Sequence, residues 1–262
     1  MSSKKTILGV FAHPDDESMG PGGTLAKYAA LGHRVAFVTA TDGGAGRLGA
    51  ERPTTDAGRA ELRAVRRAET RAAAVALGAE SLGFLGWDDG KLAELNVLDV
   101  EEAIAAVIRR ERPDVVLTFH GSGISYHPDH RVITLAVMGA VHGAARPRWY
   151  RSMSVNDLAP HRVSKLYAYV PRADAPYWRD WPREIYAAPD DEITTIVDTQ
   201  ATADVKWAAI EKHASQQSGP PFRALWTAGA FREECFVRLR PESPVGATKE
   251  TDLLDGVDDF DR

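Results

Sequence analysis

Two short segments of the chain hold histidines and carboxylates at a spacing that suits metal chemistry. The letters HPDDE at 13–17 follow an apolar run directly, and the letters HPDH at 127–130 follow another after a short Gly/Ser loop. Three carboxylates beside an imidazole repel one another and are costly to remove from water. A divalent cation would turn that repulsion into attraction, so the two segments predict a metal site.

The residue types favour a catalytic zinc site over a structural one. His13 and Asp16 would supply one nitrogen and one oxygen ligand. Either His127 or His130 would supply a second nitrogen, because residues three apart at a helix start share a face. Such a set with an open position for water is the usual plan of catalytic zinc, whereas structural zinc usually takes cysteines and this chain has one, Cys235. Zn²⁺ is therefore the expected ion, and Fe²⁺ remains open because the same donors accommodate it.

Both segments belong to an alternating pattern of strands and helices. Strands are predicted at 6–12, 34–41, 81–86, 114–120, 165–170, 193–199 and 234–240, and helices near 22–32, 56–78, 99–111, 128–144 and 201–215. This pattern is typical of an α/β fold with a mostly parallel central sheet covered by helices. Ligands of such sheets bind outside the carboxyl ends of the strands, where both segments begin. No GxGxxG follows the first strand, which argues against a dinucleotide site.

Composition and charge exclude several classes of protein. The chain has 262 residues, 44% of them apolar, and a formal net charge of −5. Seven acids and two bases between Glu242 and Arg262 account for that whole charge, so the body is close to neutral and nucleic acid is not an expected partner. No run approaches 18 apolar residues and the first residues do not resemble a signal peptide, so we expect a cytoplasmic protein without a membrane partner. A single domain over 1–241 and a disordered acidic tail over 242–262 are predicted.

The letters AHPDDE and HPDH together resemble the LmbE-like (PIG-L) family of zinc-dependent N-deacetylases. Further similarity lies in RRAETRAAAVALG at 66–78, FLGWDDGKL at 84–92 and KWAAIEKHASQ at 206–216, so that about residues 5–240 are covered. The loop at 42–50 departs from the family pattern, because many relatives carry a glutamate soon after its first glycine. The resemblance implies a Rossmann-like three-layer sandwich and an enzyme that removes acetyl groups from N-acetylglucosamine-containing substrates.

The resemblance also implies a role for each matching residue. His13, Asp16 and His130 correspond to the metal ligands, and Asp15 corresponds to the general base. His127 corresponds to the histidine that stabilises the oxyanion and assists departure of the amine. Asp129 corresponds to the acid that orients His127, and Arg66 and Asp89 correspond to positions that contact the sugar.

The chemistry of amide hydrolysis is consistent with these roles. A carboxylate that is not a ligand, such as Asp15, could take a proton from water, and His127, if protonated, could donate to the oxyanion and then to the amine. Together they predict a bell-shaped dependence of rate on pH. Asp42, with Arg66 and Asp89, lies where a polyhydroxylated substrate would be gripped. Near them, Gly20, Gly22 and Gly23 either cradle a phosphate or, as we favour, bring a helix close to the metal loop.

The predicted activity is metal-dependent removal of an acetyl group from an N-acetylated amino sugar of GlcNAc type, or from its conjugate. Two other functions remain open: an amidase for a larger sugar-thiol or secondary-metabolite amide, and a non-catalytic, metal-dependent sugar-binding protein. A metal-independent nucleotide-binding protein is a further alternative. The aglycone, the pathway, the oligomeric state (a homo-oligomer is not excluded) and the role of His213 are not legible from the sequence.

Overall fold

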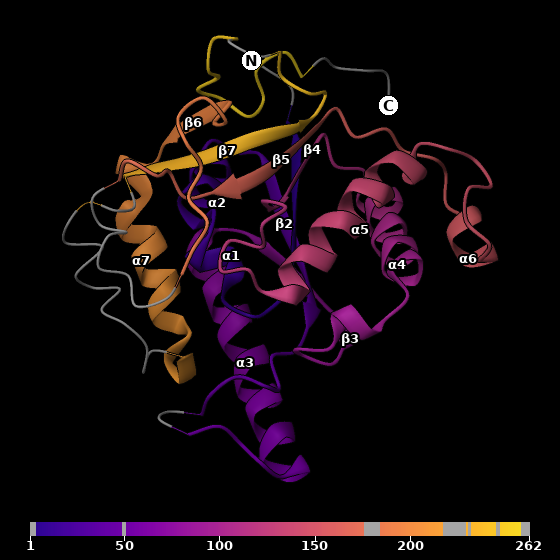
Figure 1. The fold of residues 1–262 in the computed structure, drawn as a ribbon, viewed down its shortest axis with the longest axis vertical. Helices are drawn as coiled ribbons and strands as arrows, with labels where there is room; N and C mark the ends of the chain where they lie inside the picture. Colours follow the sequence, from indigo (N-terminus) through magenta and orange to yellow (C-terminus); the bar gives the residue numbers. More distant parts are fainter. Residues whose placement is uncertain are drawn as a thin grey trace.

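The architecture is a seven-stranded sheet with the order β3-β2-β1-β4-β5-β7-β6 (Figure 1). It comes from a computed structural model that describes residues 4–48, 51–175, 184–216, 229, 232–244 and 247–257. Strands β1 to β5 run parallel, and β7 is antiparallel to both of its neighbours, β5 and β6. The strands are β1 (Thr6–Phe11), β2 (Arg34–Thr41), β3 (Glu80–Trp87), β4 (Val115–Phe119), β5 (Lys165–Val170), β6 (Thr195–Asp198) and β7 (Glu233–Arg240).

Helices cover both faces of the sheet. Helices α2, α3 and α7 pack together on one side, and α4 packs with α5 on the other (Figure 1). Strands β1 and β4 are therefore buried on both faces along their whole length, which explains why nearly all of their residues are apolar. The predicted α/β class is confirmed. The helices are α1 (Asp16–Met19), α2 (Gly22–Ala30), α3 (Asp56–Leu77), α4 (Val97–Glu111), α5 (Pro128–Ala144), α6 (Met153–Asn156) and α7 (Ala203–Lys212), with 3₁₀ turns at Leu92–Glu94, Gln200–Thr202 and Ala214–Gln216.

Capping residues fix where the long helices begin and end. The Thr55 hydroxyl accepts a hydrogen bond from the Gly58 N–H at the start of α3, and Gly78 ends that helix in a left-handed conformation with φ 69°. The Asn96 side chain caps α4 in the same way. Among the described residues, no helix is both long enough and apolar enough to serve as a membrane span.

The strand order reverses direction between β1 and β4, which lie side by side in the middle of the sheet. In open α/β sheets, the connections on either side of such a switch point diverge and leave a crevice at the carboxyl ends of the strands. The two His-Pro-Asp segments leave the sheet from these two strands. The topology therefore brings together segments that lie far apart in the sequence.

The glycine-rich loop before α2 holds an internal carboxylate. Glu234, on β7, accepts hydrogen bonds from the N–H groups of Gly23 (2.9 Å) and Thr24 (2.7 Å) and is buried. The Lys206 ammonium lies 2.7 Å from the same carboxylate and donates to the Gly20 carbonyl. An anion at this helix start is stabilised by the helix dipole, and here the protein supplies it itself. A Cβ at Gly20 would lie 2.9 Å from the Asp16 carbonyl oxygen, so this loop packs closely against the loop after β1, as the interpretation favoured from the sequence expects.

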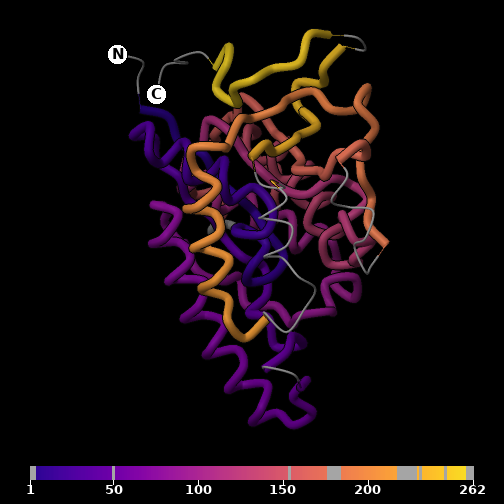
Figure 2. Tube along the Cα trace, turned by 90° about the vertical axis from the view of Figure 1, so that its left-hand side faces the viewer, coloured from indigo at the N-terminus to yellow at the C-terminus, as the bar shows by residue number. Residues whose placement is uncertain are grey.

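The expectation of a disordered tail is wrong for residues 247–257. Glu250 forms a bridge to Thr195 and an ion pair of 2.7 Å with Lys165, and Leu253 is fully buried. The Tyr28 hydroxyl donates to the Asp252 carboxylate and accepts from the Leu253 N–H. This yellow segment lies across one end of the molecule in Figure 2. Glu250 is thus paired with Lys165 and Arg238 on the sheet, which a count of charges alone does not distinguish from a solvated acid.

Candidate metal centre and active site

The loop after β1 places its polar residues by an unusual backbone. Asp15 has φ 111°, in the left-handed region that residues other than glycine seldom adopt. Its N–H donates to the Glu17 carboxylate (3.2 Å), while the His13 N–H donates to the Asp16 carboxylate (2.7 Å). Such strain persists only where the surrounding structure holds it, and it is often found at functional sites.

The segment after β4 begins a long helix. The His127 Nδ1 accepts a hydrogen bond from the Asp129 N–H (3.2 Å) and so caps α5, with Pro128 in the first turn. One turn further on, the His130 Nδ1 lies 3.1 Å from the Gly123 carbonyl, to which it donates. The ring of His130 also stacks on Phe119 with a centroid separation of 4.0 Å. These contacts fix the tautomer of His130 and leave the lone pair of its Nε2 available.

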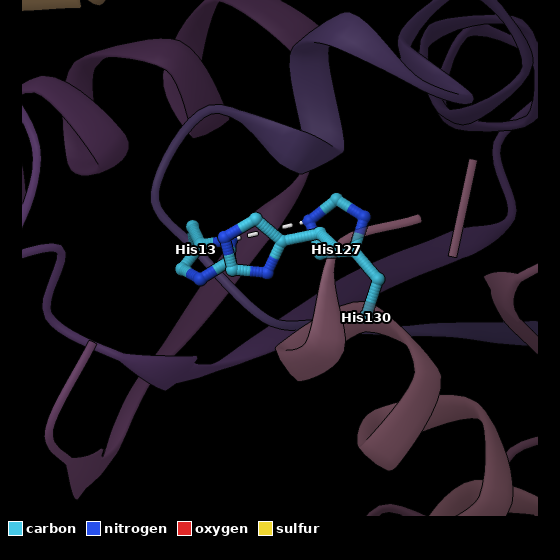
Figure 3. Close-up of side chains that lie close together, drawn as sticks. All are labelled: His13, His127 and His130. Atoms are coloured by element: carbon cyan, nitrogen blue, oxygen red, sulfur yellow. Dashed lines mark hydrogen bonds between the residues drawn. The ribbon is translucent and has the colours of Figure 1, made fainter. Parts of the chain in front are cut away.

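The side chains of His13, Asp16 and His130 converge between the two strand ends. The His13 Nδ1 lies 3.2 Å from the His130 Nε2 and 3.6 Å from Asp16, and the His130 Nε2 lies 3.3 Å from Asp16. Ligands about 2.1 Å from a tetrahedral zinc ion are about 3.4 Å from one another. This donor set therefore fits a divalent ion. Figure 3 shows the imidazoles of His13 and His130 facing each other, with His127 beside them.

His127 lies close enough to compete for the same ion. Its ring centroid is 4.6 Å from that of His13 and 5.1 Å from that of His130, and nitrogen atoms of the three rings lie within 4.8 Å of one another. Burial and the nearby His13 and His130 lower the pKa of His127. Its Nδ1 is already occupied by the helix cap, so the proton of the neutral ring lies on Nε2. In this state His127 is a hydrogen-bond donor rather than a ligand.

The far side of His13 is held by carboxylates. The His13 Nε2 lies 3.1 Å from both Asp129 and Asp89. Burial opposes charge on this imidazole, but the hydrogen bonds to Asp129 and Asp89 raise the pKa of His13 to about 10. An Nε2–H that donates to these carboxylates leaves Nδ1 as the atom that faces Asp16 and His130. Carboxylates commonly orient metal-binding histidines in this way.

The orientation predicted for Asp129 differs from the observed one. Within the described chain, the fully buried Asp129 carboxylate accepts hydrogen bonds from His13, the Gly90 N–H (2.7 Å) and the Leu92 N–H (3.1 Å), and none joins it to the His127 ring. His127 is oriented by the backbone of Asp129 instead. The reason is the helix start: the Asp129 side chain projects from the first turn of α5 toward the 90–92 turn.

Asp15 lies beside this cluster with its own partner. The Arg66 Nη2 lies 3.1 Å from the Asp15 carboxylate, and Arg66 also donates to the Pro14 and Gly43 carbonyls. Burial, reinforced by Asp16 and opposed by Arg66, raises the pKa of Asp15 to about 6. The pKa of Asp16 moves the other way: burial would raise it, but His130 and His13 hold it well below its usual range. The pKa values of two adjacent aspartates are thus shifted in opposite directions.

The residues predicted to grip the sugar hold the loops of the site. Asp89 contacts His13 and accepts from the Ala45 N–H (3.0 Å). The Asp42 Oδ2 accepts a hydrogen bond from Arg67 (3.2 Å), and its Oδ1 lies 3.0 Å from the Arg63 Nε in an ion pair. The guanidinium of Arg66 fills the space next to Gly43, where a Cβ would lie 2.5 Å from its Nη1. A role of Asp42, Arg66 and Asp89 in binding substrate stays a prediction.

One pair at the site was not predicted from the sequence. The Glu17 carboxylate lies 2.7 Å from the His213 Nε2, and both side chains are buried. The sequence shows each residue inside a segment that resembles the family, but no local pattern indicates that residues 196 positions apart pair.

Comparison with known proteins agrees with the fold and shows the family of the chain. Two histidines and an aspartate that could hold a metal ion lie beside a further carboxylate at the switch point of the α/β sheet, which is the arrangement expected of a metal-dependent hydrolase. The chain belongs to the family PIG-L: GlcNAc-PI de-N-acetylase, whose model matches residues 8–141. The family predicted from the sequence is therefore confirmed.

Relatives and solved structures resemble the chain over almost its full length. A 1D-myo-inositol 2-acetamido-2-deoxy-alpha-D-glucopyranoside deacetylase of Thermomonospora curvata is 34% identical, over 97% of each chain. An N,N'-diacetylchitobiose deacetylase from Pyrococcus horikoshii is 25% identical with a TM-score of 0.70, over 90% of this chain and 84% of that one. A conserved protein of Thermus thermophilus is 27% identical with a TM-score of 0.68, over 94% of this chain and 99% of that one. The predicted activity, deacetylation of an amino sugar or its conjugate, agrees with the family and with these relatives.

Proposed function

We propose that this protein is a zinc-dependent deacetylase that hydrolyses the acetamide of an N-acetylated glucosamine conjugate. The first substrate to test is 1D-myo-inositol 2-acetamido-2-deoxy-alpha-D-glucopyranoside, on which relatives 34% identical over 97% of the chain act. The observation that carries the proposal is the placement of Asp15. Its carboxylate stands beside the His13–Asp16–His130 cluster, is paired with Arg66 and is not needed as a ligand.

His13, Asp16 and His130 would hold the ion. When bound there, it supplies a Lewis acid that polarises the amide carbonyl and makes water a stronger nucleophile at neutral pH. Two nitrogens and one oxygen suit Zn²⁺ and also Fe²⁺, so metal analysis of protein purified with and without added zinc distinguishes the two.

Asp15 takes the proton of the attacking water while the oxygen adds to the acetyl carbon. With a pKa near 6, its carboxylate is ionised at neutral pH yet basic enough to accept that proton. When the C–N bond breaks, Asp15 returns the proton to the departing nitrogen. The products are the amine and acetic acid, which ionises to acetate by giving its proton to the amine or to solvent, and Asp15 is again a carboxylate.

His127 would stabilise the oxyanion through its Nε2–H. The helix cap holds Nδ1 as an acceptor, so the ring is a neutral donor without a second proton. A neutral imidazole can polarise a carbonyl in this way. The geometry therefore supports the oxyanion part of the predicted role of His127, and the return of a proton to the amine falls to Asp15.

The test is release of acetate and of free amine from a panel of acetylated compounds. The panel contains the inositol conjugate, N,N'-diacetylchitobiose, free N-acetylglucosamine and a larger sugar-thiol amide. We expect turnover of at least one acetamide, loss of turnover with a chelator, and recovery with Zn²⁺. Binding of these compounds without release of acetate would instead indicate a non-catalytic sugar-binding protein, and preference for the larger amide would indicate an amidase.

A further inference from the structure

A buried ion pair, Glu17 and His213, connects the loop after β1 with the segment that follows α7. The fully buried Glu17 accepts a hydrogen bond from the Ser18 hydroxyl (2.7 Å) and lies 2.7 Å from the His213 Nε2, all through its Oε1. Its other oxygen accepts from the Asp15 N–H (3.2 Å). Glu17 therefore joins the backbone of Asp15 to a histidine at the end of α7.

His213 opens a short turn that touches several walls of the site. The Ser215 N–H and hydroxyl both donate to the Glu69 carboxylate at 2.7 Å, on α3 and three residues after Arg66. Gln216 is bonded to both the N–H and the carbonyl of Arg47, in the loop after β2. We call residues 213–216 the strap. The strap contacts the loop after β1, helix α3 and the loop after β2, and so fixes these three segments relative to one another.

We propose that Glu17 and His213 are positioning residues that hold Asp15 in its left-handed conformation and so aim its carboxylate at the reacting water. The proposal rests on the function proposed above. Asp15 has φ 111°, a conformation that costs free energy in a residue other than glycine. The hydrogen bond from its N–H to Glu17 offsets that cost, and His213 in turn fixes Glu17.

The chemistry of the pair suits this role. A buried carboxylate needs donors on both oxygens, and Glu17 receives three: the Asp15 N–H, the Ser18 hydroxyl and the His213 imidazole. Among the described residues, the buried Nδ1 of His213 has no hydrogen-bond partner. The imidazole is therefore bound through one nitrogen only, and that nitrogen faces Glu17.

Glu17→Gln and His213→Ala test the proposal. Glu17→Gln keeps the shape of the side chain, but its NH₂ group cannot accept a hydrogen bond. Either the Asp15 N–H or the Ser18 and His213 donors therefore lose their acceptor. We expect kcat to fall about 10-fold to 100-fold in each variant, as for other residues that orient catalytic groups, with KM and bound zinc unchanged. His213→Gln, which can still donate to Glu17, should recover most of the kcat lost in His213→Ala.

Glu250→Gln is the matched control. Glu250 also carries buried contacts, to Lys165 and Tyr167, but lies in the C-terminal segment away from the site. The Glu250→Gln variant should have a lower unfolding temperature than the wild-type protein and the same kcat per folded molecule. Wild-type kcat in folded Glu17→Gln and His213→Ala would overturn the proposal.

A crystal structure of His213→Ala tests the positioning role independently of activity. We expect Asp15 to leave the left-handed region and to separate from Arg66. An unmoved Asp15 would overturn the positioning role, whether or not the wild-type protein deacetylates anything. Absence of acetate release by the wild-type protein, with Asp15 displaced in the variant, would overturn the proposed function alone.

Discussion

The two His-Pro-Asp segments share three letters and adopt different structures. After β1, Asp15 takes a left-handed backbone and pairs with Arg66. After β4, Asp129 is helical, fully buried and without an arginine among its partners in the described chain. The histidines differ as well: His13 belongs to the cluster with Asp16 and His130, whereas His127 caps a 17-residue helix.

The difference follows from which neighbour binds the N–H of the aspartate. The Asp15 N–H donates forward to Glu17, whereas the Asp129 N–H donates back to His127. The backward bond is a helix cap, and it starts a long helix. The bond from the Asp15 N–H to Glu17 stabilises a strained turn, and the Asp15 carboxylate then lies at the site beside Arg66. The same letters thus yield a carboxylate paired with Arg66 beside the cluster in one place, which we propose as the base, and a fully buried structural acid in the other.

The largest effect expected from this comparison is that of Asp15→Asn. Loss of a general base typically lowers kcat by about 10²-fold to 10⁴-fold, and the metal content should not change because Asp15 is not a ligand. Initial rates and bound zinc, measured on the same samples, check both statements. The matched change in the second segment is Asp129→Asn, and an equal loss of kcat there with zinc retained would break the comparison.

The two histidines of the second segment should respond differently. His127→Ala removes a donor to the oxyanion and should lower kcat by about 10²-fold to 10³-fold with zinc retained. His130→Ala removes a ligand and should lower zinc affinity more than the roughly 10-fold to 100-fold that outer contacts cost. Zinc titration of chelator-treated protein measures the second effect. If both variants lost zinc equally, His127 would be a ligand as well and its proposed role as a donor would be wrong.

The pH dependence separates a neutral His127 from a protonated one. Asp15 accepts a proton only when ionised, and its pKa is raised to about 6, so kcat/KM should fall about tenfold per unit below pH 6. The pKa of His127 is lowered, so His127 stays neutral at higher pH and imposes no loss there. Rates from pH 5 to 9 test this, and a decline starting near pH 7 would restore His127 as a protonated acid.

The smallest expected effects are on stability. Asp129→Asn should lower the free energy of unfolding by about 1–3 kcal/mol, because buried donors lose a partner. Asp15→Asn should not lower it at pH 7. The pKa of Asp15 is higher in the folded protein than in the unfolded chain, so ionisation of this carboxyl destabilises the fold as the pH rises through about 4 to 6. Asparagine does not ionise and therefore avoids this loss of stability. Urea unfolding of chelator-treated variants excludes a contribution from bound metal, and a less stable Asp15→Asn would contradict the argument.

Much of the fold was predictable because strands that are covered on both faces need apolar residues along their length, and the sequence shows such runs. Strands β1 and β4 are nearly all apolar because both of their faces are covered. The end of α3 at Gly78 is set by a left-handed residue that favours glycine. The short helix α1 was not predicted, because four residues are too few to show a period. The tail around Glu250 was misjudged for a related reason, since the partners that order it lie on the sheet.

The sequence by itself determined the chemical inventory of the site and its place at two strand ends. Residue types and spacing are local properties, so His13 and Asp16 could be predicted as ligands, with either His127 or His130 as the third. The resemblance to the family then pointed to His130 as that ligand and to Asp15 as the base. Only the tertiary structure decided how these groups are shared. It turned Asp129 toward His13, used Glu234 to fill the glycine loop and paired Glu17 with His213. Each of these contacts joins residues more than 100 positions apart, and hydrogen bonds act over a few ångströms of space rather than along the chain.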